Sequence, residues 1–294
     1  MILHDAALAA DRCAYYGAAI FLFGAGAFLR ALAPRRLGGA IAQCLRLPAA
    51  AAVVLAVTAT AAWLPLEAGA IGGSWRAGFD PSTLEAILFG TSLGPVWMAR
   101  AGLCVLLVSC LLARPAGWGG LASVSALLLV NLAFSGHAAM DEGARSAFHI
   151  ADHALHLLAG AAWLGGLVPL LPCLTALRHP WLGQDAALAL RRFSAAGHAA
   201  VALVLVTGVI DTVLVLGRWP IHWSSPYEAL LAAKIGLVGV MIGLAVINRY
   251  RLTPRISIEG AAAISAIRRH AMAELGLGAC VLTLVAVFGQ LDPT

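Results

Sequence analysis

Charged residues are scarce in this chain. Of its 294 residues, 11% are Asp, Glu, Lys or Arg and 61% are hydrophobic, which gives a mean hydropathy of +0.90. A soluble domain carries about 25% charged residues, so this composition excludes an ordinary soluble protein. Several apolar runs reach the roughly 20 helical residues that cross a hydrocarbon core, and we therefore predict an integral membrane protein.

Several motifs are also absent. The six cysteines form no C-x-x-C pair, and we interpret them as small packing residues. No H-E-x-x-H stretch is present, which argues against a membrane zinc hydrolase. The net charge of +5 comes without an aromatic-interleaved basic patch, so no nucleic-acid partner is expected. Residues 1–12 lack the basic flank of a cleaved signal peptide, and we expect a retained N-terminal tail there.

The apolar runs predict an all-α polytopic membrane protein, a single integral domain over residues 1–294 embedded in the lipid bilayer. Eight transmembrane helices are expected, at about 13–33, 47–66, 95–113, 119–138, 149–173, 193–216, 228–247 and 271–290. Residues 82–93 are mildly apolar and predict a short helix at the membrane interface.

A faint internal repeat divides the chain. The stretches EAIL at 85–88 and EALL at 228–231 each precede or begin a span that ends in arginine. In this alignment Arg100 falls roughly where Lys234 falls. The pattern is typical of two parallel four-helix repeats, over residues 1–140 and 141–294, as found in transporters.

The arginines predict the orientation in the membrane. They concentrate around three connections, which join spans one and two, five and six, and seven and eight and which lie on the same side of the membrane. These arginines are Arg30, Arg35, Arg36, Arg46, Arg178, Arg191, Arg192, Arg249, Arg251, Arg255, Arg268 and Arg269. Cytoplasmic loops carry the excess of Lys and Arg. Both termini are then expected on the opposite side, which is the periplasm for a protein of a bacterial inner membrane.

The stretch HIADHALH at 149–156 opens a long apolar span. An α-helix turns about 100° per residue, so His149, Asp152, His153 and His156 share one stripe. Polar groups inside a membrane usually face the bundle interior or a wet cavity. Neutral imidazoles are the commonest transition-metal ligands, and an aspartate can ligate the ion or orient a ring. The stripe therefore predicts a metal site, with a buried hydrogen-bond network as the structural alternative.

Other ionisable groups are expected at the same outer depth. His137 and Met140 follow the fourth span, and Asp211, Lys234 and Arg100 lie in the outer parts of three more spans. Lys234 and Arg100 can instead pair with acidic residues or extend to the interface. Imidazole suits zinc, copper, iron and nickel alike, so the ligand types alone do not select the metal.

Four motifs, in their order and spacing, resemble the bacterial copper-resistance protein D family. They are SGHAAM at 135–140, HIADHALHLLAGAAWLGGLVPL at 149–170, RRFS at 191–194, and PYEALLAAK with NRYRLTP between 226 and 254. The resemblance implies an eight-span inner-membrane protein that moves copper inward or handles it at the membrane. It also implies a separate periplasmic copper carrier of the CopC type as partner.

By this resemblance, His137, His149, Asp152 and His156 match family positions, whereas His153 is an additional histidine of this chain. The expected function is copper transport or homeostasis rather than catalysis. Imidazole and carboxylate ligands suit Cu(II), and Met140 would assist with Cu(I). The inner halves of the spans carry few ligand types, so the onward route of the ion is not evident from the sequence.

Two rival functions stay open at this stage. In a membrane cytochrome, histidines on neighbouring spans would ligate haem b axially. A second, inner haem would need a partner for His198, and the predicted spans contain no other histidine at that depth. A proton-linked transporter of an organic solute would bind no metal at all.

Overall fold

The computed structural model describes residues 2–113, 117–135, 143–220 and 225–289. Within these ranges the regular structure is entirely helical, which confirms the predicted all-α class. The α-helices are α1 Ile2–Ala27, α2 Arg35–Cys44, α3 Arg46–Ile71, α4 Pro81–Gly90, α5 Leu93–Leu112, α6 Gly117–Leu132, α7 Gly143–Ala176, α8 Gly183–Leu216, α9 Pro226–Ile247, α10 Thr253–Glu259 and α11 Ala261–Phe288.

The membrane-spanning helices agree with the apolar runs. Seven helical segments of the described chain are long and apolar enough to cross a membrane, and α6 is a shorter apolar helix of 16 residues. These are the eight elements that the sequence predicts. The short helix expected near 82–93 is α4, where Asp80 caps the first turn by accepting a hydrogen bond from the Thr83 amide at 3.0 Å. Hydrogen bonds from Ser82 and Thr83 hold the pKa of Asp80 below its ordinary value.

The N-terminal segment, which we expected as a retained tail ahead of a first span at residue 13, is part of the same helix as that span. Helix α1 begins at Ile2, and the imidazole of His4 is buried and stacked on Trp75 with 4.0 Å between ring centroids. Asp11 and Arg12 face a cavity inside the bundle.

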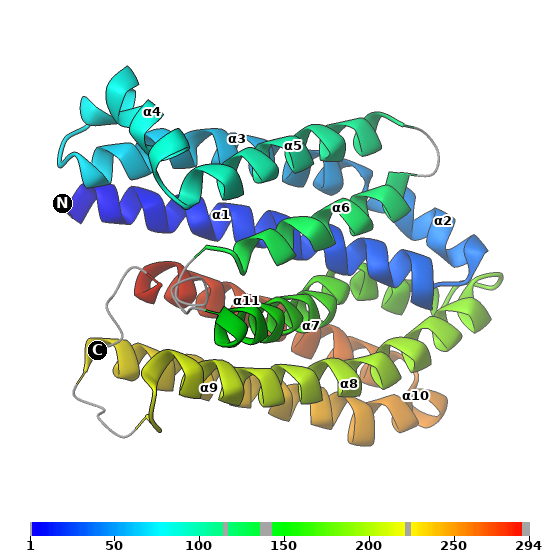
Figure 1. The fold of residues 1–294 in the computed structure, drawn as a ribbon. Helices are drawn as coiled ribbons and strands as arrows, with labels where there is room; N and C mark the ends of the chain where they lie inside the picture. The colour runs from blue at the N-terminus through cyan, green and yellow to red at the C-terminus, as the bar shows by residue number, and fades with distance from the viewer. Residues whose placement is uncertain (1, 114–116, 136–142, 221–224, 290–294) are drawn as a thin grey trace.

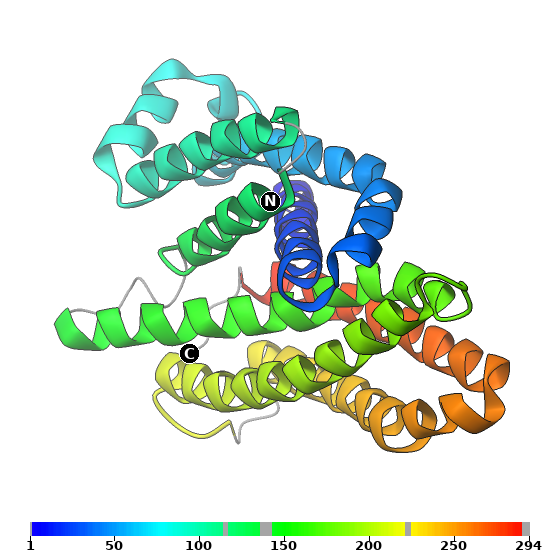
Figure 2. The ribbon, with the colours of Figure 1, turned by 90° about the vertical axis from the view of Figure 1, so that its right-hand side faces the viewer.

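Helix α1 is the axis of the bundle. It packs against α3 and α6 on one side and against α7 and α11 on the other, as Figure 1 and Figure 2 show. Its contact with α7 depends on two glycines. A Cβ on Gly165 would overlap the carbonyl oxygen of Ile20 and lie 3.0 Å from the Cα of Gly24. Small residues allow transmembrane helices to approach closely, so this contact holds the two groups of helices together.

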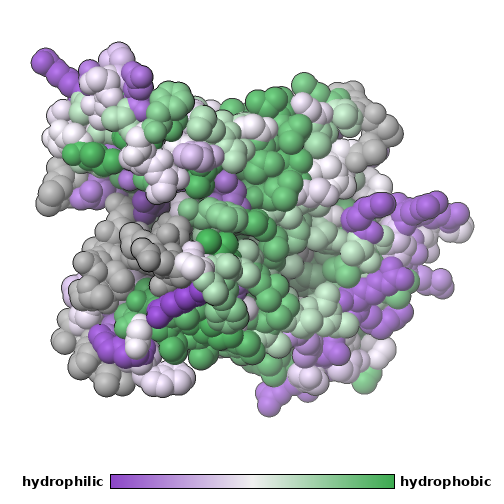
Figure 3. All heavy atoms as spheres, in the orientation of Figure 1, coloured by the Kyte–Doolittle hydropathy of each residue, from purple (hydrophilic) through white to green (hydrophobic). Residues whose placement is uncertain are grey.

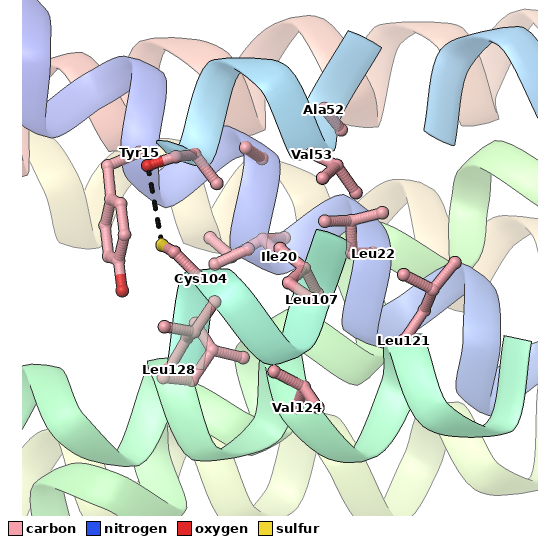
Figure 4. Packing of buried hydrophobic residues seen from close by; sticks show 14 of the residues in the cluster. Tyr15, Ile20, Leu22, Ala52, Val53, Cys104, Leu107, Leu121, Val124 and Leu128 are labelled. Carbon is pink, nitrogen blue, oxygen red and sulfur yellow. Dashed lines mark hydrogen bonds between the residues drawn. The ribbon is translucent and has the colours of Figure 1, made fainter. Parts of the chain in front are cut away.

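The buried core lies mainly among α1, α3, α5 and α6. Figure 4 shows Leu22, Leu107 and Leu128 interlocked within it. Tyr15 lies at the rim of this cluster, with its hydroxyl directed away from the packed aliphatic side chains. The rim of the core thus adjoins a polar space.

The two ends of the bundle differ in charge. The turns that join α1 to α3, α7 to α8 and α9 to α11 lie at one end (Figure 1). The arginines that the sequence analysis named lie in these turns and in the adjoining parts of the helices. Figure 3 shows hydrophilic side chains gathered there and an apolar surface across the middle of the molecule. We call this the basic end. Helix α1 begins and α11 ends at the opposite end, the termini end, as the predicted topology requires.

Candidate functional site

The predicted stripe lies on α7, on the face that packs against α8. His149 and Asp152 are buried, with 1% and 8% of their surface exposed. His153 is partly exposed, and all these residues lie near the termini end. The 3.6-residue periodicity therefore predicts their common side of the helix, while the facing helix decides what each side chain contacts.

Two imidazoles of the stripe converge on one oxygen atom. His149 donates from Nε2 to Oδ1 of Asp211 at 3.2 Å, and His153 donates from Nδ1 to the same oxygen at 3.1 Å. Asp211 belongs to α8, so the two helices are joined by a shared carboxylate. The structure thus brings together His149, His153 and Asp211, which the sequence placed at one depth.

The other two stripe residues are arranged differently. His156 donates from Nδ1 to the hydroxyl of Thr207 at 2.9 Å, one helical turn further from the termini end than Asp211. Thr207 in turn donates to the Leu203 carbonyl at 2.6 Å. Oδ2 of Asp152 is buried and has no hydrogen-bond partner. A buried oxygen in this condition is costly, so Asp152 retains a free capacity to accept a hydrogen bond or ligate a cation.

A cavity of about 210 Å³ adjoins the site between the two groups of helices. Its ionisable and phenolic lining residues are Asp11, Arg12, Tyr15, Tyr16, Glu67, Arg100, His153, Asp211, Tyr227 and Lys234. The structure therefore gathers His153, Asp211, Lys234 and Arg100 around one space, as their common depth suggested.

Sequence reasoning missed the part of this cavity that α1 and α3 contribute. Tyr15 and Glu67 each carry a buried oxygen without a hydrogen-bond partner. The signal was available, because Asp11 and Tyr15 are four residues apart and share a face once α1 is taken as helical from its start. Glu67 was missed because it lies one residue beyond the predicted second span.

Arg100 has a different set of partners from those expected. Its guanidinium carbon lies 4.8 Å from the centroid of the Tyr15 ring and 5.8 Å from that of Trp63. Its Nε donates to Oδ1 of Asn131 at 3.1 Å, and Asn131 donates to the Val96 carbonyl. The side chain is 7% exposed, so aromatic faces and an amide hold this cation inside the bundle.

The described members of the predicted ligand set are not arranged around a common point where a metal ion could bind. Among the described residues, no group of three or more His, Cys, Asp or Glu side chains is arranged so that it could hold a metal ion. The imidazoles are instead hydrogen-bonded to Asp211 and Thr207. His137 and Met140 lie outside the described residues, so their predicted role stays a prediction.

The inner half of the bundle holds a histidine that the sequence analysis overlooked. His270 lies in α11, near the basic end, and donates from Nδ1 to Oδ1 of Asn248 at 2.8 Å. The statement that His198 is the one inner histidine of the spans is therefore wrong. The predicted boundary at residue 271 excluded His270, whereas α11 begins ten residues earlier, at Ala261.

Comparisons with known proteins agree with this architecture. Residues 3–147 match the family described as copper resistance protein D-like, N-terminal domain, and residues 187–288 match copper resistance protein D. None of the solved structures matches the chain.

Three relatives extend the match. Inner membrane protein YebZ of Escherichia coli (strain K12) is 34% identical, covering 91% of each chain. Copper resistance protein D of Pseudomonas syringae pv. tomato is 30% identical, covering 99% of this chain and 98% of the relative. Copper transport protein CutJ of Bacillus subtilis (strain 168) is 30% identical, covering 78% of this chain and 42% of the relative. The chain therefore belongs to the copper resistance protein D family.

Proposed function

We propose that this protein takes copper from the periplasmic side of the inner membrane and moves it toward the cytoplasm. The names of its relatives, which include a copper resistance protein and a copper transport protein, support copper as the cargo. The role is transport or handling of the ion, without a catalysed reaction. The basic end then faces the cytoplasm, by the positive-inside rule, and both termini face the periplasm.

One observation carries the proposal. His149 and His153 both contact Oδ1 of Asp211, and His153 and Asp211 line the cavity of about 210 Å³. Imidazole nitrogens and a carboxylate are ligands that Cu(II) accepts. Copper in the cavity would meet Asp211 beside both rings, since one oxygen of this carboxylate accepts a hydrogen bond from each imidazole.

Capture then requires a small local rearrangement. The unprotonated nitrogen of each neutral ring is the one that does not donate to Asp211, and the rings must turn so that these nitrogens face the ion. The buried Oδ2 of Asp152 is available as a further oxygen ligand near the same rings. Lys234 and Arg100 line the cavity and balance its charge when the ion leaves. His156 with Thr207 is the next polar pair along the helix.

The size of the cavity favours an ion over haem b. Pockets for organic ligands measure about 300–1,000 Å³, which exceeds the 210 Å³ found here. A copper carrier of the CopC type in the periplasm would deliver the ion to the termini end. An absorption spectrum of the purified protein tests the rival directly, since a Soret band would identify haem.

The test compares Asp211→Asn and the double variant His149→Ala with His153→Ala against wild type. We expect copper affinity of the purified protein to fall about tenfold or more, the range seen when groups that support a metal ligand are lost. Cell-associated copper should fall in parallel. Glu85→Gln and His179→Ala are matched controls, because both residues are exposed and neither lines the cavity.

Equal copper binding and accumulation in the variants and the controls, with all proteins inserted in the membrane, would contradict the proposed site. Loss of binding in the Asp211 variant with normal binding in Glu85→Gln would attribute the effect to this carboxylate rather than to net charge.

A further inference from the structure

A second cavity, of about 260 Å³, lies between α8 and α9 in the half of the bundle toward the basic end. Within the described chain these two helices make few direct contacts with each other, since α8 packs on α7 and α9 packs on α11. Leu205 and Val246 line the cavity and are each 48% exposed, whereas Trp163 and Leu167 at its floor are buried. This inner cavity therefore opens sideways, toward the lipid that surrounds the bundle.

The inner cavity has a polar end and an apolar end. Ser194 and His198 on α8 and Arg249 beyond α9 line the part nearer the basic end, because α8 begins at that end and α9 finishes there. The lining residues between 201 and 205 of α8 and between 242 and 246 of α9 are all apolar, and they lie nearer the middle of the bundle. This is the polarity of a phospholipid whose head group lies at the basic end.

The length of the cavity also fits one leaflet of a bilayer. Along α8 the lining runs from the polar Ser194 to the apolar Leu205, which corresponds to a rise of about 16.5 Å. The hydrocarbon core of a bilayer is about 30 Å thick, so each leaflet contributes about 15 Å. An acyl chain that lies along α8 would therefore reach from the membrane surface to the midplane.

Arg249 supplies a positive charge at the polar end of the cavity. Its Nη1 donates to Oγ of Ser194 at 2.6 Å, which holds the guanidinium across the gap between the two helices. A guanidinium carries five N–H donors, and the bond to Ser194 engages one of them. Its planar fork suits phosphate oxygens, which it binds through paired N–H groups. The position and the chemistry of this side chain thus indicate a phosphate as its ligand.

A hydrogen-bond chain fixes the backbone that carries this arginine. Residues Asn248–Leu252 form a π-helical turn after α9. Nδ2 of Asn248 donates to Oε1 of Glu274 at 3.1 Å, and its Oδ1 accepts from Nδ1 of His270 at 2.8 Å. Glu274 is 1% exposed, so this carboxyl group anchors the turn from within the bundle. Wide turns of this kind are frequent at functional sites, and here the turn presents Arg249 to the cavity.

The chain on both sides of the polar end is basic. Residues 186–210 and 248–255 together contain five arginines and no aspartate or glutamate. Glu259, an exposed acid further along, is paired with Arg255 at 3.6 Å. Basic pockets between transmembrane helices on the cytoplasmic side bind anionic lipid head groups. The charge of this region therefore complements an anionic head group.

We propose that the inner cavity binds an anionic phospholipid of the leaflet at the basic end. One acyl chain lies between α8 and α9, and Arg249 holds the phosphate. The apolar lining favours the chain, while the guanidinium and the neighbouring arginines select the negative charge. The lipid also fills the gap between two helices that otherwise make little contact. This site needs no copper, so the inference does not depend on the proposed function.

The test titrates the full chain, purified in detergent, with phosphatidylglycerol or phosphatidylcholine of identical acyl chains and counts bound lipid by native mass spectrometry. Gly197→Leu fills the cavity from α8, where an added Cβ meets no atom within 4 Å. Gly236→Leu is its matched control, because this glycine has the same free space but does not line the cavity. Arg249→Gln removes the charge, and Arg251→Gln removes an exposed arginine of the same turn.

We expect wild type, Gly236→Leu and Arg251→Gln to bind one phosphatidylglycerol about tenfold more tightly than phosphatidylcholine. Gly197→Leu should weaken the binding of both lipids. Arg249→Gln should lose the preference for phosphatidylglycerol, and Arg249→Lys, which keeps a cation, should retain part of it.

Three results would overturn the proposal. Equal affinity of Gly197→Leu and Gly236→Leu for phosphatidylglycerol would show that the acyl chain does not occupy the cavity. An equal preference for the anionic lipid in Arg249→Gln and Arg251→Gln would show that Arg249 does not hold the head group. Displacement of the bound lipid by inorganic phosphate would identify a site for the free anion, in which the acyl chain has no part.

Discussion

Helices α1–α6 and α7–α11 use similar contacts to different effect. In the first group α1 packs on α3 and α5 on α6, and in the second α7 packs on α8 and α9 on α11. The groups differ at one place. Helix α3 also packs on α5, whereas α8 and α9 make few direct contacts within the described chain and enclose the inner cavity. The second group therefore encloses a cavity of its own, whereas the outer cavity is lined by both groups.

The corresponding cations show the same contrast. Arg100 is held by Tyr15, Trp63 and Asn131 inside the packed group. Lys234, which falls at the matching place in the repeat, lines the outer cavity from α9 and is only partly buried. Both cations line the outer cavity, and two aromatic faces and an amide hold the Arg100 guanidinium in place there. The division at residues 140 and 141 stays a prediction.

The largest effect should come from the contact that joins the two groups. Gly165→Val would place a side chain on the backbone of α1, and we expect the free energy of unfolding to fall by more than about 3 kcal/mol. Gly236→Val is the control, because a Cβ there meets no atom within 4 Å. Thermal unfolding in detergent measures both. Similar stability of the two variants would mean that the groups do not depend on this contact.

The next largest effect concerns Arg100 and Lys234, whose replacement should lower stability by different amounts. Arg100→Met removes the cation from two aromatic faces and leaves the Asn131 oxygen without its donor, which should cost about 3 kcal/mol of stability. Lys234→Met should cost about 1 kcal/mol or less, since its ammonium group lies at a cavity wall and methionine retains the packing of the apolar stem. Chemical denaturation of both variants provides the measurement. A larger loss of stability for Lys234→Met would show that Arg100 is not the more firmly held of the two cations.

The repeated EA(I/L)L stretches give the smallest contrast. Glu85 is exposed on α4, whereas Glu228 is fully buried at the start of α9 and bonded to Arg218 at 2.6 Å. Arg218→Ala leaves a buried carboxylate without this cation and should cost about 1–3 kcal/mol. Glu85→Gln should change stability by less than about 0.5 kcal/mol. The melting temperatures of the two variants provide the measurement. Equal shifts would show that the ion pair between Arg218 and the buried Glu228 does not stabilise the fold.

Much of the helical framework follows from the sequence because the bilayer fixes the length of each apolar run. All eight predicted spans have a counterpart, and α4 lies where a short helix was expected. Helix α1 begins before the predicted span, and Asp11 and Arg12 within it line the outer cavity. Their cavity exists only where α1 meets other helices, so the spacing of Asp11 and Tyr15 indicates a shared face but not the cavity.

The sequence predicts part of the candidate site. The spacing of His149, His153 and His156 fixes their common face, since it depends on the pitch of one helix. That two of them share Oδ1 of Asp211 while the third bonds Thr207 depends on how α7 crosses α8. Their role as copper ligands stays a prediction.

The sequence by itself determined the class of protein, the helices and the concentration of arginine at one end. These properties follow from local periodicity and from the cost of charge in lipid, which act on each segment separately. Tertiary structure alone decided that the outer cavity is shared by both groups of helices and that Glu274 lies beneath a second one. Those outcomes depend on contacts between residues distant in the chain, and the geometry of helix packing sets them.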